Sequence, residues 1–107
     1  MKLKEFMKAN LNLENGDWIG GIFSVFGGKV HVLLNESLEV DFDHLDPRLK
    51  EICLNSEVTQ YFRKGPYNSS YMYEVKLDLR VESCKTYAVT EVVLEDGSKF
   101  ISKGGEW

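Results

Sequence analysis

The residues whose types could do chemistry are concentrated in the stretch 38–47, which reads LEVDFDHLDP. It contains four carboxylates and one imidazole, on Glu39, Asp41, Asp43, Asp46 and His44. Such side chains bind metal ions and serve as general acids and bases. They also cover solvated strand faces and surfaces that attract basic partners. The segment could therefore be a metal site, an acid–base catalytic site, a solvated strand face or a surface for a basic partner.

The spacing of the acids predicts a strand face. Leu38, Val40 and Phe42 alternate with the acids, so Glu39, Asp41 and Asp43 would share one face at intervals of about 7 Å. A calcium loop would need a central glycine and a terminal glutamate, and this pattern is absent. Asp41, Asp43 and His44 could contact a transition metal if the chain bends at His44, but no second histidine or cysteine follows at ligand spacing. We expect no metal and no cofactor.

Catalysis by a nucleophile would require Cys53 or Cys84 beside a base, and the only imidazoles are those of His31 and His44. No motif places these residues together, and Cys53 falls on the apolar side of a predicted helix, where cysteine is usually a small core residue. An acid–base set of His44 with Asp41 and Asp43 is the enzyme alternative. We expect a protein that is not an enzyme and has no catalytic residues.

The net charge of −4 comes from one segment. Five of the 17 acids lie between Glu36 and Asp46, where there is no lysine or arginine; the remaining 12 acids face 13 basic residues. Nucleic acid is not an expected partner, because Arg63 and Lys64 form a small basic footprint beside their neighbouring aromatic residues and the chain is acidic overall. An acidic segment of this kind fits a basic protein surface.

The elements that must position these residues are mostly strands. In the first half, the spacing of Leu3, Phe6 and Met7 indicates a short helix that ends near Asn10, although the segment could equally be an edge strand. We also predict a hairpin of strands 18–26 and 30–34 that turns at Gly27-Gly28, and a strand over 38–43. Asp46 followed by Pro47 predicts the start of a second helix, because the carboxylate caps free N–H groups and proline suits the first helical position. Asn55 or Ser56 should end it.

The second half predicts strands at 58–63, 71–81, 86–94 and 99–101, with turns at 65–70 and at Asp96-Gly97. Alternation over 71–81 places Val75, Leu77 and Leu79 inside and Lys76, Asp78 and Arg80 outside. The 107 residues fit a single domain, 1–107. The predicted fold is mainly β (α+β): an antiparallel β-sandwich or a strongly curved antiparallel sheet, with one or two short helices.

The compartment expected from the sequence is the cytoplasm. The first residues lack the continuous apolar region of a secretory signal, no apolar run is long enough to cross a membrane, and two cysteines are too few for a disulfide framework.

A small acidic β domain with its excess charge in one segment and no catalytic motif resembles the immunity proteins of bacterial toxins, including those of contact-dependent growth inhibition systems. The resemblance is in general character over the whole chain. It implies that the chain neutralises a cognate toxin, such as a nuclease, by binding it. The partner-binding residues would be the acidic set with two aromatic anchors, namely Glu36, Glu39, Asp41, Asp43, His44, Tyr67 and Tyr71. The oligomeric state is left open.

The alternative of a different class is a small-ligand-binding or structural β domain. In that interpretation a curved sheet would hold an apolar ligand between Trp18, Phe23, Phe26 and the tyrosines, although a filled core would use the same residues.

Overall fold

The computed structural model describes residues 1–35, 45–86 and 89–103. In chain order, the elements are α1 (Leu3–Asn10), the 3₁₀ turn η1 (Leu13–Asn15), β1 (Trp18–Phe26), β2 (Lys29–Asn35), α2 (Pro47–Leu54), β3 (Val58–Tyr67), β4 (Ser70–Leu77), β5 (Val81–Thr86), β6 (Val89–Leu94) and β7 (Lys99–Lys103). The fold is α+β and mainly strands, as predicted. The expected strand over 38–43 lies outside the described residues.

The strands form a four-stranded sheet with the order β2-β1-β4-β3 and a three-stranded sheet with the order β5-β6-β7. Neighbouring strands are antiparallel except for β1 and β4, which are parallel. The larger sheet is therefore mixed, whereas the sequence led us to expect antiparallel pairs throughout. Alternation along a strand favours antiparallel pairing, because parallel strands usually occur in sheets covered on both faces. In the described part of the chain, helices cover one face of this sheet only, so β4 alternates although one of its neighbours is parallel.

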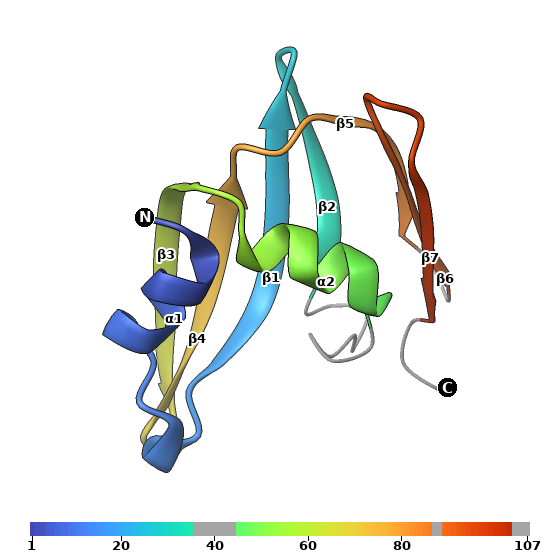
Figure 1. The fold of residues 1–107 in the computed structure, drawn as a ribbon. Helices are drawn as coiled ribbons and strands as arrows, with labels where there is room; N and C mark the ends of the chain where they lie inside the picture. The colour runs from blue at the N-terminus through green and yellow to red at the C-terminus, as the bar shows by residue number, and fades with distance from the viewer. Residues whose placement is uncertain (36–44, 87–88, 104–107) are drawn as a thin grey trace.

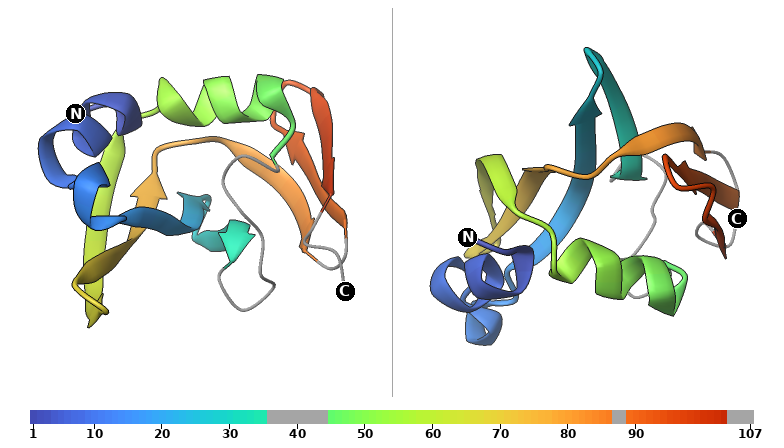
Figure 2. Two further views of the ribbon diagram at one scale, coloured as in Figure 1. Left: turned by 90° about the horizontal axis from the view of Figure 1, so that it is seen from below. Right: turned by 45° about the horizontal axis from the view of Figure 1, so that its top comes forward.

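Both helices lie on the same side of the four-stranded sheet (Figures 1 and 2). Phe6 of α1 contacts the rings of Tyr61 in β3 and Tyr73 in β4, at centroid distances of 4.8 and 5.8 Å. From α2, Arg48 lies 5.2 Å from the ring of Phe100 in β7. One hydrophobic core therefore joins α1, α2 and both sheets. Neither helix of the described residues is long and apolar enough to cross a membrane.

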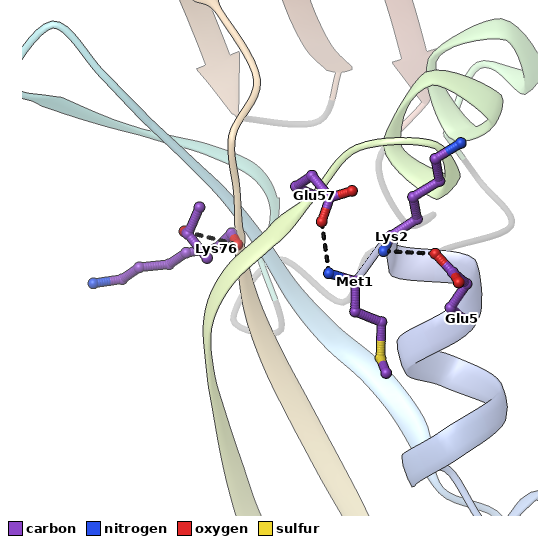
Figure 3. A network of polar contacts seen from close by, with 6 residues as sticks. Met1, Lys2, Glu5, Glu57 and Lys76 are labelled. Carbon is purple, nitrogen blue, oxygen red and sulfur yellow. Dashed lines mark hydrogen bonds and ion pairs between the residues drawn. The ribbon is translucent and has the colours of Figure 1, made fainter.

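Local side-chain contacts explain where the helices begin. In α1 the carboxylate of Glu5 accepts from the backbone N–H of Lys2 at 3.0 Å, and the ammonium group of Met1 contacts Glu57 at 2.6 Å just before β3 (Figure 3). In α2 the Asp46 carboxylate accepts from the Arg48 N–H at 2.9 Å, and Pro47 occupies the first turn. The predicted helix start is thus confirmed, and Asn55 is the C-cap.

The predicted strand 71–81 is divided between the two sheets. β4 ends at Leu77 and β5 begins at Val81, so the residues between them connect one sheet to the other. Val75 and Leu77 are buried and Asp78 and Arg80 are exposed, as predicted, but Leu79 and Lys76 are only half-buried. The predicted hairpins are confirmed: β1 and β2 turn at Gly27-Gly28 (φ 60° and 75°), and β6 and β7 turn at Gly97 (φ 91°).

Candidate binding surface

The candidate surface is the face of the four-stranded sheet that is turned away from the helices. No helix or strand of residues 1–35, 45–86 and 89–103 covers it (Figure 2). Because Tyr73, Val75 and Leu77 belong to the core, alternation places Met72, Glu74 and Lys76 on the other face. We call this side of the sheet the open face. Strand pairing adds neighbours from β1 and β3, so that it carries Trp18, Phe23, Phe62, Lys64, Tyr67, Met72, Glu74 and Lys76.

Two large aromatic side chains lie together on the open face. The rings of Trp18 and Tyr67 have centroids 5.9 Å apart, and these residues are 37% and 47% exposed. Met72, which pairs with Trp18 across the sheet, is fully buried without belonging to the core cluster. Gly20 leaves the necessary space, because a Cβ at this position would lie 2.4 Å from Cγ of Met72. We call Trp18 and Tyr67 the aromatic pair.

Charged side chains also lie on the open face. The ammonium group of Lys64 contacts the Glu74 carboxylate at 2.6 Å, and that of Lys76 lies 5.8 Å from the ring centroid of Phe62. Phe62 is itself exposed. Exposed aromatic rings beside charged groups are typical of residues that anchor protein interfaces.

The two tyrosines named as anchors point to opposite faces of the sheet. Tyr67 is on the open face, whereas Tyr71 is half-buried on the helix side, where the guanidinium of Arg63 lies 4.4 Å from its ring centroid. The backbone N–H of Tyr71 donates to Oδ1 of Asp17 at 2.8 Å. Of the two, Tyr67 is the one placed to meet a partner on the open face.

Sequence reasoning missed two residues that build this surface. From the sequence, Trp18 is a candidate only for an apolar ligand site, because nothing in the sequence pairs it with Tyr67. Asp17 is a buried carboxylate that accepts from the N–H groups of Asn12 and Tyr71, at 2.9 and 2.8 Å. Its position after Asn15-Gly16 is typical of an exposed turn residue, so the neighbouring sequence does not predict that Asp17 is buried.

Glu36, Glu39, Asp41, Asp43 and His44 lie outside the described residues. Both flanks of their segment are described. β2 ends at Asn35, which pairs with Gly21, and Leu45 is buried in the core. Gly21 lies three residues along β1 from Trp18, so β2 ends level with the middle of β4, short of the sheet end that holds the aromatic pair (Figure 1). Three strand spacings separate β2 from β3, which amounts to about 15 Å.

The cysteines are not activated nucleophiles. Burial raises the pKa of the Cys53 thiol to about 12 and that of Cys84 to about 11, and Cys84 donates from Sγ to the carbonyl oxygen of Val32 at 2.8 Å. Both groups are therefore protonated at neutral pH, and the thiolate is the reactive form. Within the part of the chain that the structure describes, no group of three His, Cys, Asp or Glu residues could hold a metal ion.

The aromatic residues of the ligand alternative are distributed along β1. Trp18 and Phe26 are its first and last residues, so their backbones are about 25 Å apart at the rise of a strand. Trp18 contacts Tyr67, whereas Phe26 lies under the guanidinium of Arg80 at 5.4 Å. They do not surround one common space.

No protein-family model, curated protein or solved structure matches this chain. The fold and the surface together define a small α+β domain that exposes a pair of aromatic side chains on one sheet face.

Proposed function

We propose that this chain is a non-enzymatic cytoplasmic binding protein, and that it is an immunity protein which neutralises a cognate toxin by covering a basic surface. The observation that carries the proposal is the exposed aromatic pair, Trp18 and Tyr67, together with the end of β2, which leads into the acidic segment and pairs with Gly21, three residues along β1 from Trp18. A protein interface uses both features, aromatic anchors and charge complementary to the partner.

The two features have different physical roles. Rigid aromatic rings that become buried supply most of the affinity of a typical interface. Acidic side chains such as Glu39, Asp41 and Asp43 accelerate encounter with a basic partner and reject partners of the wrong charge. A toxin that cleaves nucleic acid is basic where it binds phosphate, so a cluster of carboxylates can occupy the same site in place of the substrate.

The test begins with the gene next to the one that encodes this chain. Its product is co-expressed with the chain in cells, growth is measured, and binding of the two purified proteins is measured by calorimetry. We expect the neighbouring protein to arrest growth alone, to be harmless together with this chain, and to bind it with a one-to-one stoichiometry. A neighbouring protein that is not toxic, or that this chain neither binds nor neutralises, contradicts the proposal.

Two variants then test the assigned residues. Replacing Glu39, Asp41 and Asp43 by Lys should weaken protection, because attraction becomes repulsion. Trp18→Ala together with Tyr67→Ala should weaken binding by about 2 kcal/mol or more, as truncation of aromatic anchors usually does. Ile101→Ala is the matched control, since Ile101 is also an exposed apolar residue but lies on β7 of the other sheet. Full protection by both variants would exclude these residues from the interface.

A further inference from the structure

A second candidate site lies at the opposite side of the sheet, where α1 meets η1 and the end of α2. A hollow of about 430 Å³ opens there, lined by Lys4, Met7, Lys8, Leu11, Leu13 and Leu54. This volume is within the range of small-molecule sites, about 300 to 1,000 Å³. None of these residues belongs to the open face, so the hollow is separate from the surface proposed above.

The floor of the hollow is aliphatic. Met7, Leu11 and Leu54 are half-buried and pack against the hydrophobic core, and Leu13 at the mouth is 75% exposed. Burial of a leucine side chain contributes about 1.5 to 3 kcal/mol of free energy. At its observed exposure, Leu13 obtains little of this contribution from the described residues. A bound aliphatic chain would cover it.

The rim carries positive charge without a matching acid. Lys4 and Lys8 are one helical turn apart on α1, and within the described residues neither forms an ion pair. Glu5, the acid of this helix, instead accepts from the backbone of Lys2 (Figure 3). Among the described residues, the lining of the hollow contains no carboxylate.

We propose that this hollow binds a small amphiphile with one anionic end, namely a medium-chain aliphatic carboxylate. The aliphatic chain lies on Met7, Leu11 and Leu54 under Leu13, and the carboxylate contacts the ammonium groups of Lys4 and Lys8. Both parts of the ligand are needed, because the floor offers only apolar contact and the rim only charge.

The test uses decanoate below its micelle concentration, decanol of the same chain length, and acetate, each titrated into ¹⁵N-labelled protein and followed by NMR. We expect saturable shifts for decanoate at the amides of α1, η1 and Leu54. Decanol should bind about tenfold more weakly, as expected when two exposed ion pairs are lost, and acetate should not bind.

Variants separate charge from apolar contact. Lys4→Gln with Lys8→Gln should weaken decanoate about tenfold and leave decanol unchanged. Lys29→Gln with Lys85→Gln is the matched control, because it removes the same charge from exposed positions on β2 and β5 and should change neither titration. Leu13→Ser should weaken both ligands.

Three results would overturn the site. The first is equal affinity for decanoate and decanol, which would leave the lysines without a role. The second is a set of chemical shift changes scattered over the molecule, which would mean that decanoate does not bind at this hollow. The third is binding that begins only with micelles or vesicles, which would indicate a lipid surface in place of a free carboxylate.

Discussion

Among single residues, Asp17 is the one on which the aromatic pair most depends. Its carboxylate is buried and joins the backbone of Asn12 to that of Tyr71, at the start of β4. The following residue is Trp18, so the bonds of Asp17 hold the beginning of β1 against β4. A buried carboxylate that accepts two N–H groups fixes its neighbours more strictly than apolar contact does, because hydrogen bonds are directional.

Asp17→Ala should lower the free energy of unfolding by about 2 to 4 kcal/mol, since it leaves two backbone donors without their acceptor. Asp17→Asn should cost less, because the amide oxygen still accepts one bond. Urea unfolding followed by tryptophan fluorescence measures both. If Asp17→Ala changes stability by less than about 0.5 kcal/mol, as an ordinary surface substitution does, the structural role given to this carboxylate is wrong.

At the scale of elements, the start of α2 combines a cap with an ion pair. The Asp46 carboxylate accepts from the backbone of Arg48 and also contacts its guanidinium at 3.1 Å. The hydrogen bond from the Arg48 side chain is the largest cause that lowers the pKa of Asp46, followed by the bond from the Arg48 backbone. Ionised Asp46 therefore stabilises the start of α2, the helix whose Arg48 lies over Phe100 of β7.

This contribution should depend on pH. The folded-state pKa of Asp46 is lowered, so its stabilisation is complete above the unfolded value of about 3.9 and is lost as pH falls through the folded value. Asp46→Asn should therefore melt at a lower temperature than the unmodified chain at pH 7, and the two melting temperatures should converge below about pH 4. Asp78→Asn, an exposed aspartate between the sheets, is the control. A difference in melting temperature for Asp46→Asn that is the same at pH 7 and pH 3 would contradict the assignment.

At the scale of the whole molecule, charge is unevenly distributed along the chain. Five acids lie in residues 36–46, whereas the described surface mixes both signs in pairs such as Lys64 with Glu74 and Arg80 with Glu95. A field from one acidic segment attracts basic partners over distances set by the ionic strength. If the partner is the basic toxin proposed above, encounter with it should therefore be faster than for a chain with neutral residues in this segment.

Stopped-flow association with the proposed toxin partner should show this field directly. The rate constant of the unmodified chain should fall as salt is added, because the screening length shortens from about 30 Å at 0.01 M to about 8 Å at 0.15 M. The Lys variant of Glu39, Asp41 and Asp43 should associate more slowly, with the largest deficit at low salt. If the association rate constants of the two proteins depend on salt in the same way, these acids do not accelerate the encounter.

The sequence by itself determined the local elements. Asp46-Pro47 predicted the start of α2, Gly27-Gly28 predicted the turn between β1 and β2, and alternation after Tyr71 predicted the buried face of β4; the structure confirms all three. These features depend on residues close together in the chain, because capping, positive φ and side-chain alternation are set within a few positions.

The tertiary structure alone decided which elements became neighbours. Alternation could not reveal that β4 pairs with β1 in parallel, or that the chain passes from one sheet to the other after Leu77. It also could not show that Trp18 and Tyr67 share the open face while Tyr71 lies on the helix side. A local pattern specifies which residues of one strand share a face. Which face the helices cover, and which distant strand lies alongside, depends on packing between segments far apart in the sequence.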